Sequence, residues 1–372
     1  MPSLDRRRFL SRAAVACTMP SLVMGCLDDS PMSIETRYRR AVQQVMDQYH
    51  LPGALVSVRH PGDAEWKQAF GYAHVATQTP IDPDSYFPIR SITKSFTVTL
   101  LLQLAAERLD SPIAPYFPTV PHAGTITFAD LAGMQSGIAD YSGSTAFVDV
   151  LRADFQHRFT EQELVDYAIP ISPLFVPRAQ YDYSNTNTVL LGMFVASVAG
   201  SSLPTVLQRL ILDPLGMKNT FYPVVVPLPM SHPTPYDVDV RSGAIQELPL
   251  ISPTSLAGAG AMVSTLDDLQ TWAAALGDGR LVGAALQMER IQRSRVVTGG
   301  PEYDRYGLGI GILNGWWGHT GSGIGWQLAT LYDPRSGATI SVMVNSTPVG
   351  DRGDLNFAQE IFEAVAEVVE SR

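Results

Sequence analysis

Segments with strand character lie at both ends of this chain, and helical segments lie between them. Near the start, GALVSVRH (53–60) and EWKQAFGYAHV (65–75) are rich in β-branched and aromatic residues and are separated by the turn sequence PGDA. Near the end, three similar runs occur, at 306–313, 326–333 and 338–345. Strands from the two ends can pair with each other, so we expect one antiparallel sheet flanked by helices, an α+β fold.

The middle of the chain predicts an inserted all-α lobe. Its clearest helical segments are TFADLAGMQSGIADY, TEQELVDYAI and NTVLLGMFVASVAG, with Thr160 and Glu163 forming a capping pair. We expect one domain over 33–365, with an α/β lobe over about 33–95 plus 255–372 and a helical lobe over about 96–254. Binding sites tend to form in the cleft between such lobes.

Residues 1–26 have the pattern of an export signal. Arg6, Arg7 and Arg8 precede a weakly apolar stretch from Ala13 to Gly25, which is shorter than the about 20 residues that span a bilayer. The pair of arginines resembles a twin-arginine signal, and VMGC resembles a lipoprotein cleavage box that ends at Cys26. We therefore expect an exported protein, either periplasmic or held in the cell envelope by a lipid anchor on Cys26.

Composition excludes several kinds of site. The formal net charge is −10 and basic residues do not cluster beyond the first dozen positions, which disfavours nucleic-acid binding. Both cysteines lie at or before position 26, so later disulfides and cysteine-ligated metals are excluded, and the seven histidines lack zinc-site spacing. We expect no cofactor, and the sequence leaves the oligomeric state open.

RSITKSF (90–96) holds one of only three lysines among 26 basic residues. Residues i and i+3 share a helix face, so Lys94 can reach the hydroxyl of Ser91. A buried lysine can lose its proton and activate a serine, whereas arginine cannot. Helix-start N–H groups near Ser91 also favour an oxyanion. The alternative is that Ser91 only caps the helix and that Lys94 is a surface residue.

Two later motifs add chemistry. The first is Tyr183-Ser184-Asn185. The phenol of Tyr183 can take part in a proton relay, and the amide of Asn185 can bind a substrate amide. The alternative is that this segment is an ordinary turn. His319-Thr320-Gly321 lies in a glycine-rich run beside strand-like sequence; the alternative for this histidine is a satisfied surface side chain.

In this order, the three motifs resemble those of the serine β-lactamase and penicillin-binding protein family: SxxK, then SxN or YxN, then KTG or HTG. LAGMQSGI (131–138) and GAGAMVSTLDDL (258–269) also resemble recurring stretches of that family, and the similarity extends over about 35–365. The branch that it resembles most contains class C β-lactamases, a D-alanyl-D-alanine carboxypeptidase and related esterases and D-amino-acid peptidases.

The resemblance implies a role for each matching residue. Ser91 would form the acyl-enzyme, Lys94 would be its hydrogen-bonded base partner, and Tyr183 would be the general base and acid. Asn185 would contact a substrate amide. The sheet edge beside the substrate would be lined by His319, Thr320 and Gly321, and the oxyanion hole would be formed by the N–H groups of Ser91 and Ser322.

The third motif begins with histidine instead of lysine. Histidine is only partly charged near neutrality, so it is a weaker partner for a substrate carboxylate, and we expect activity to change between about pH 5.5 and 7.5 as it titrates. We therefore expect a peptidase of the D-alanyl-D-alanine carboxypeptidase type or an esterase, acting on a small peptide, ester or β-lactam. The alternatives are a class C-like β-lactamase, a non-enzymatic lipoprotein that senses penicillin or peptidoglycan, and a structural envelope protein with a decayed site.

Overall fold

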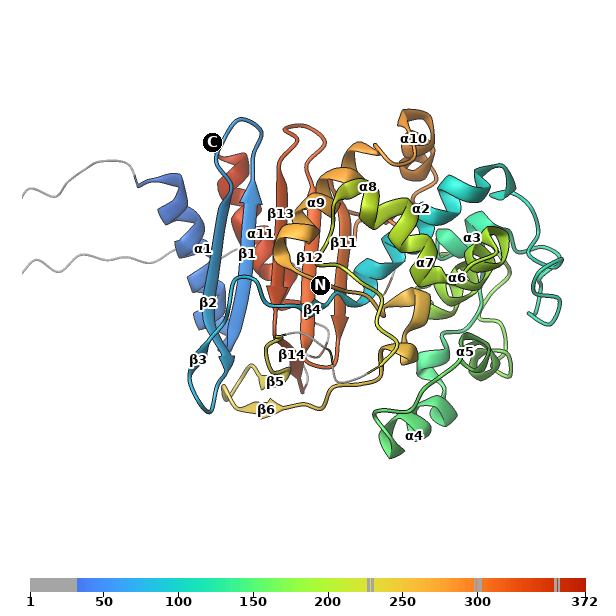
Figure 1. The fold of residues 1–372 in the computed structure, drawn as a ribbon, viewed down its shortest axis with the longest axis horizontal. Coiled ribbons are helices and arrows are strands. Elements are labelled where there is room, and N and C mark those ends of the chain that lie inside the picture. The colour runs from blue at the N-terminus through green and yellow to red at the C-terminus, as the bar shows by residue number, and fades with distance from the viewer. Residues whose placement is uncertain are drawn as a thin grey trace, which may run out of the picture. The chain divides into compact units, whose positions relative to one another are not determined.

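The strands predicted at the two ends of the chain pair in one nine-stranded antiparallel sheet (Figure 1). Strand β1 from the N-terminal part lies between β2 and β13, with Ala54 opposite Val344 and Arg59 opposite Thr339. The strand order is β3-β2-β1-β13-β12-β11-β10-β9-β8. The predicted fold class, an antiparallel sheet flanked by helices, is confirmed.

This computed structural model describes residues 32–225, 228, 231–297, 299, 303–350, 353 and 355–372. The expected export signal at 1–26, with Cys26, lies outside the described residues.

The strands of the large sheet are β1 Gly53–Arg59, β2 Trp66–His74, β3 Thr79–Pro80, β8 Arg295–Val296, β9 Arg305–Tyr306, β10 Gly311–Leu313, β11 Trp316–Gly323, β12 Trp326–Tyr332 and β13 Thr339–Val344. Two small sheets contain β4 Phe87–Pro88 with β7 Val263–Ser264, and β5 Tyr236–Asp239 with β6 Ile245–Glu247 and β14 Ser346–Val349.

The helices are α1 Ile34–Tyr49, α2 Thr93–Ala105, α3 Phe128–Ala132, α4 Thr145–Ala153, α5 Glu161–Ala168, α6 Asn185–Ala199, α7 Leu203–Leu207, α8 Asp213–Leu215, α9 Leu266–Asp278, α10 Ala284–Gln292 and α11 Phe357–Glu370. Short turns of 3₁₀ helix include η1 Arg90–Ile92, η2 Ala106–Arg108, η3 Tyr141–Gly143, η5 Pro253–Ser255 and η6 Ala257–Ala259, and η4 Gln208–Leu212 is a π turn.

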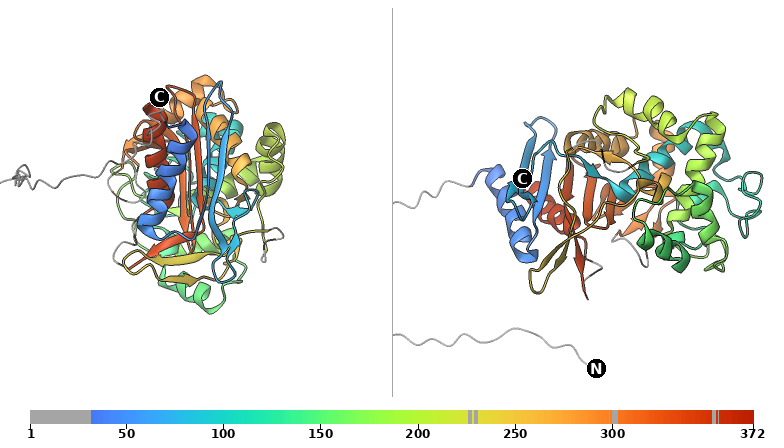
Figure 2. Two further views of the ribbon diagram at one scale, coloured as in Figure 1. Left: turned by 90° about the vertical axis from the view of Figure 1, so that its left-hand side faces the viewer. Right: turned by 60° about the horizontal axis from the view of Figure 1, so that its bottom comes forward.

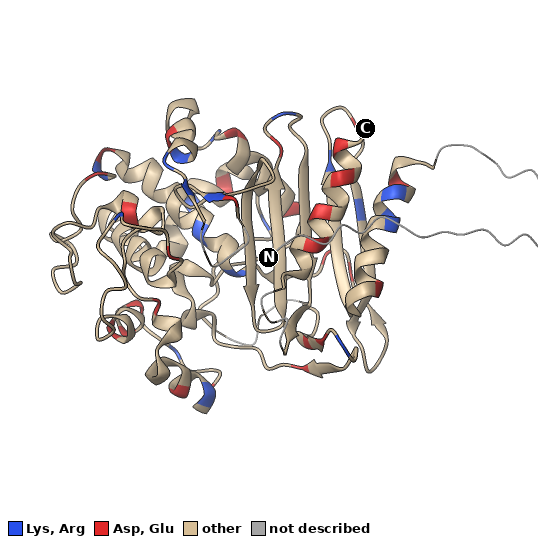
Figure 3. Cartoon of the chain, turned by 180° about the vertical axis from the view of Figure 1, so that it is seen from behind, with Lys and Arg blue, Asp and Glu red and all other residues tan. Residues whose placement is uncertain are grey.

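Helices cover both faces of the sheet. Helices α1 and α11 lie side by side on one face (Figure 2), and α9 packs on β12 and β13 from the other. Alternate side chains follow this division, since Val342 and Val344 of β13 join the core under α11 whereas Met343 joins the core under α9. Burial on both sides explains why β12 and β13 carry no charged residue (Figure 3).

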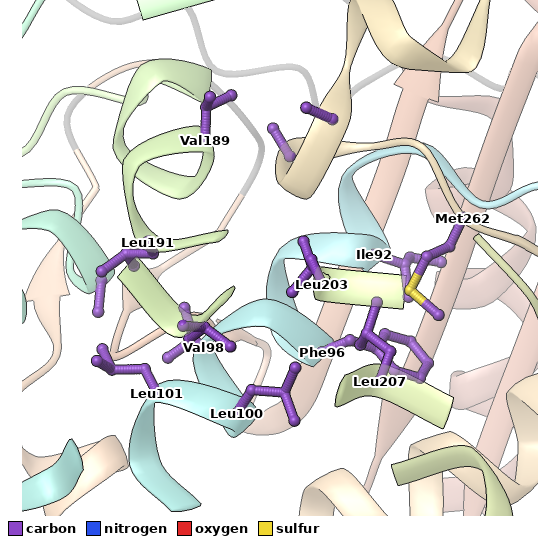
Figure 4. Packing of buried hydrophobic residues seen from close by; sticks show 14 of the residues in the cluster. Ile92, Phe96, Val98, Leu100, Leu101, Val189, Leu191, Leu203, Leu207 and Met262 are labelled. Atoms are coloured by element: carbon purple, nitrogen blue, oxygen red, sulfur yellow. The ribbon is translucent and has the colours of Figure 1, made fainter. Parts of the chain in front are cut away.

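Helix α2 is the buried centre of the helical side. Its apolar residues contact α6, α7 and the 257–262 segment (Figure 4), and Phe96 stacks on Trp272 of α9 with ring centroids 3.6 Å apart. Because α2 is enclosed on nearly all sides, its position, and that of any side chain at its N-terminus, is tightly constrained.

Two details of the middle region differ from the sequence-based expectation. The segment 236–247 forms β5 and β6, and β5 pairs in parallel with β14 near the C-terminus. Such short strands leave little periodic signal. The helix expected over 127–141 ends at Ala132, because Met134 and Gly137 take left-handed backbone angles, with φ of 56° and 76°. The capping pair of Thr160 and Glu163 is present as expected.

Within the described part of the chain, no single helix combines the length and apolar character of a membrane span. Helix α6 meets that test only together with Leu203–Leu215, at a bend of 74°.

Candidate active site

The predicted pair of Ser91 and Lys94 is present at the start of α2. Ser91 lies in the turn η1, which leads directly into α2, and Lys94 is the second residue of that helix. The Lys94 Nζ lies 3.0 Å from the Ser91 Oγ, within hydrogen-bonding distance. The side chain of Lys94 is fully buried.

Two other oxygens contact the Lys94 amine. The Asn185 Oδ1 lies 2.6 Å from Nζ, and the backbone carbonyl of Ala259 lies 2.8 Å away. Asn185 begins α6 and Ala259 belongs to η6, so three separate segments meet at this amine.

Asp140 determines the orientation of the Asn185 amide. Its Oδ2 lies 2.8 Å from the Asn185 Nδ2, and an ionised carboxylate can only accept hydrogen bonds, so Nδ2 must be on that side and Oδ1 must face Lys94. Asp140 is itself held by the backbone N–H and the hydroxyl of Ser142, each at 2.9 Å.

This arrangement directs the lone pair of a neutral Lys94 amine at Ser91. The Asn185 amide oxygen and the Ala259 carbonyl are pure acceptors, so they take two N–H bonds, and the third direction is toward the Ser91 hydroxyl. Burial lowers the pKa of Lys94 to about 7, although the Asp140 charge acts in the opposite direction. The amine is therefore substantially deprotonated near neutral pH.

Tyr183 lies on the other side of Lys94. The Lys94 Nζ is 4.9 Å from the centre of the Tyr183 ring, and the phenol oxygen is buried next to the Ser91 side chain. Burial, together with the neighbouring Tyr306 and Tyr303, raises the pKa of Tyr183 well above its usual value, and only the Ser91 side chain acts against this. This direction favours Lys94 over Tyr183 as the acceptor of the Ser91 proton. The role of general base and acid that the family resemblance implies for Tyr183 stays a prediction.

His319 is not among the described residues that line the cavity. It is fully buried, with its Nε2 3.0 Å from the Tyr306 hydroxyl and its Nδ1 2.5 Å from the Thr320 carbonyl. A carbonyl can only accept, so Nδ1 carries the hydrogen. Burial lowers the pKa of His319 to about 3. The expected partial charge near neutrality, and the titration between pH 5.5 and 7.5 assigned to it, are therefore wrong, because burial removes water from the ring.

Thr320 and Gly321 hold β11 in place. The Thr320 hydroxyl lies 2.8 Å from the Tyr303 hydroxyl, and a Cβ added at Gly321 would lie 2.4 Å from the carbonyl oxygen of Ile89. Only glycine allows the strand to lie this close to η1. The next residue, Ser322, lines the same cavity as Ser91. The pairing of their N–H groups in an oxyanion hole stays a prediction.

A cavity of about 940 Å³ opens at this site. Ser91, Asn185 and Ser322 line it, whereas His319, Thr320 and Gly321 are not among its described lining residues. One wall is apolar and comes from α4 and the following loop, with the side chains of Phe147, Val148, Leu151 and Phe155. The Ser91 hydroxyl thus lies at the edge of a partly apolar cavity, a setting that is typical of small-molecule sites.

The family model described as Beta-lactamase matches residues 38–363. This match covers most of the chain. The chain belongs to the beta-lactamase family. Its fold and the order of its three motifs agree with that membership.

One sequence relative and two solved structures show which members of the family this chain is similar to. The chain is 27% identical over 234 residues to a D-aminopeptidase of Brucella anthropi, covering 62% of this chain and 44% of that protein. It therefore spans less than half of that relative's length. Among solved structures, a D-amino acid amidase from Ochrobactrum anthropi SV3 complexed with D-phenylalanine gives a TM-score of 0.81 at 25% identity, over 90% of this chain and 99% of that one. A D-stereospecific amidohydrolase from Streptomyces sp. gives 0.73 at 29% identity, over 87% and 97%.

Sequence reasoning missed several residues of this beta-lactamase-family site. Asp140 is one of 36 acidic residues, and no local pattern distinguishes it. Ala259 contributes only its backbone carbonyl, although the GAGAMVS stretch around it resembles a segment of the family. The tyrosines at 303 and 306 that enclose His319 follow no motif either, because their contact with it depends on the pairing of β9, β10 and β11.

Proposed function

We propose that this chain is a serine hydrolase that cleaves amide bonds of small substrates through an acyl-enzyme on Ser91. The observation that carries this proposal is the buried Lys94 amine, whose remaining hydrogen-bonding direction points at the Ser91 hydroxyl from 3.0 Å. A lysine with a pKa of about 7 is matched to proton transfer at neutral pH.

The proposed reaction uses Lys94 as the general base. Lys94 takes the Ser91 proton as Oγ attacks the substrate carbonyl carbon, and the N–H groups of Ser91 and Ser322 stabilise the oxyanion. The intermediate collapses, the amide C–N bond breaks, and the leaving amine receives a proton from the Lys94 ammonium, with the neutral Tyr183 phenol as a relay. A water, deprotonated by Lys94, then attacks the acyl carbon of the Ser91 ester. The bond between that carbon and Oγ breaks, the acid is released, and the Lys94 ammonium returns the proton to the Ser91 oxygen.

The two hydrogens of the Asn185 amide nitrogen differ in this scheme. One bonds Asp140 at 2.8 Å, and the other has only a 3.4 Å contact with the Ser142 hydroxyl. The second hydrogen is the one that a substrate carbonyl would accept. We therefore keep the predicted contact with a substrate amide and add a positioning role toward Lys94.

Relatives named for D-amino-acid substrates support amide substrates that contain a D-residue. The carboxypeptidase, β-lactamase and esterase activities expected from the sequence belong to the same acyl-enzyme chemistry. A panel of acetyl-D-Ala-D-Ala, a chromogenic cephalosporin, a short-chain nitrophenyl ester and a D-amino-acid amide separates them by turnover.

The test of the proposal is covalent labelling. A fluorophosphonate should add one label to the parent protein, located on Ser91 by peptide mass spectrometry, and the label should be lost in Ser91→Ala but retained in Ser202→Ala, an exposed serine at the start of α7. Full labelling of Ser91→Ala would overturn the proposal. A label that forms with no turnover of any panel substrate would favour the non-enzymatic sensor.

We further propose that residues 1–26 export the chain and that Cys26 carries a lipid anchor. The three arginines, the short apolar stretch and the VMGC sequence support this. Metabolic labelling with an alkyne-tagged fatty acid should mark the parent protein and fail with Cys26→Ala. Equal labelling of both would contradict lipidation at Cys26.

A further inference from the structure

Arg90 directly precedes the nucleophile and lines the same cavity. Its side chain is only 6% exposed. One guanidinium nitrogen donates to the carbonyl of Ile324 at a long 3.3 Å, and the Arg90 Nε has no partner among the described residues. Among the described residues, the Nε donor of this buried cation is therefore unsatisfied, and one of its Nη nitrogens has only this long hydrogen bond.

No counter-charge acts on Arg90 within the described residues. Burial alone lowers the pKa of Arg90 to about 10, with no carboxylate opposing it. An unpaired buried charge is costly, and proteins usually pair it or satisfy it with several acceptors. The other fully buried arginine, Arg290, shows that solution, because it donates to the Leu308, Ser95 and Gly309 carbonyls and to the Thr99 hydroxyl at 2.9–3.4 Å.

The guanidinium lies beside the turn that follows the proposed oxyanion strand. A Cβ added at Gly323 would be 3.9 Å from the Cδ and Nε of Arg90, so the absent side chain leaves space there. The carboxylate of Asp237 also lines the cavity, but it is engaged with the Thr347 hydroxyl at 2.6 Å and forms no ion pair with Arg90. The cavity thus holds a buried cation beside Ser91, and its Nε donor has no partner among the described residues.

We propose that Arg90 binds a carboxylate of the substrate, so that the site selects small peptides with a free carboxylate next to the scissile bond over the corresponding amides. This inference rests on the proposed function. A planar guanidinium offers paired donors that match a carboxylate. The neutral, buried His319 cannot serve as that cation, and Lys94 is engaged with three oxygens, which leaves Arg90 beside the nucleophile for this task.

Binding is measured in the full-length Ser91→Ala protein, so that no turnover occurs. Calorimetric titrations with acetyl-D-Ala-D-Ala and with its C-terminal carboxamide should give a dissociation constant at least about tenfold lower for the acid, as expected for one charge-assisted interaction. Adding Arg90→Met, which keeps an apolar stem of similar length, should reduce the preference to less than about threefold. Arg90→Lys, which keeps the charge but loses the paired donors, should fall between them.

The matched control is Arg152→Met in the same background, since Arg152 is exposed and lines the opposite α4 wall of the same cavity. It should keep the preference for the acid. Equal binding of acid and carboxamide by the Ser91→Ala protein, or no binding of either, overturns the inference, and so does a preference that survives Arg90→Met. Melting temperatures establish that each variant is folded. Labelling of Ser91 in the parent is measured separately, so the proposed function and this inference can fail independently.

Discussion

The Asp140 carboxylate accepts a 2.8 Å hydrogen bond from the Asn185 amide nitrogen, and this contact decides which end of the amide faces Lys94. With Oδ1 toward the amine, the lysine is held by an acceptor at 2.6 Å. With the amide reversed, two donors would face each other. Asp140 is thus a positioning residue that acts on the proposed nucleophile through the side chains of Asn185 and Lys94.

Replacing Asp140 with asparagine should lower activity and move its pH dependence. The loss of one charge-assisted hydrogen bond, about 1.5 kcal/mol, corresponds to a fall in kcat/KM of about tenfold. The Asp140 charge also raises the pKa of Lys94, so its removal should shift the rising limb of the pH–rate profile to lower pH. A lower rate with an unshifted limb would contradict this coupling and leave only a structural role.

The rate of hydrolysis should rise with pH through about 7, because Lys94 must be neutral to take the Ser91 proton. A histidine with its ordinary pKa would give a similar profile, so a variant is needed to show that the rise in rate reports Lys94. His319→Gln replaces one neutral group by another and should lower the rate without moving the midpoint, since His319 itself titrates near 3. Disappearance of the rising limb in His319→Gln would mean that ionisation of His319, and not of Lys94, controls the rate.

Lys94→Arg should be nearly as inactive as Lys94→Met. Arginine keeps the positive charge but does not release its proton, and a positioned general base contributes about 10²–10⁴ in rate. Turnover of the best panel substrate and the rate of fluorophosphonate labelling measure this. A Lys94→Arg protein with more than a tenth of the parental rate would show that charge suffices.

Lys94 should also affect stability in a pH-dependent way. Its pKa is about 7 in the folded protein and near 10.5 when unfolded, so between these values the unfolded chain binds more protons and stability rises with pH. The stability of the parent relative to Lys94→Met should therefore increase from pH 7 toward pH 10, by at most about 1.4 kcal/mol per pH unit. Urea unfolding of both proteins at several pH values tests this, and a constant difference would mean that Lys94 ionises normally.

Gly321→Ala should reduce activity by moving β11 away from η1. The added Cβ would lie 2.4 Å from the Ile89 carbonyl, and relief of such a clash costs about 1–3 kcal/mol. We expect lower thermal stability, together with a fall in kcat that is larger than any change in KM. The reason is that the Ser322 N–H would move away from the oxyanion that it is proposed to stabilise. Gly124→Ala, where a Cβ meets open space, is the matched control and should match the parent in both measurements.

Several features could be predicted from local sequence. The Ser91–Lys94 contact follows from helical spacing, the Thr160 cap follows from a short motif, and the β1–β2 hairpin follows from two apolar runs around PGDA. Each depends on residues close in the chain, where geometry is set by the backbone alone. The pairing of terminal strands was also predictable, because strong strand signals at both ends had few other partners.

The amino-acid sequence by itself determined that a serine and a lysine would share one helical turn, and in what order the three motifs occur. Only the tertiary structure decided that Lys94 is fully enclosed, that His319 is buried and neutral, and that Asp140 and Arg90 lie at the site. The physical reason is that a pKa and a hydrogen-bond direction depend on which distant segments exclude water around a group. Those segments, from η3 to β11, meet only when the chain is folded.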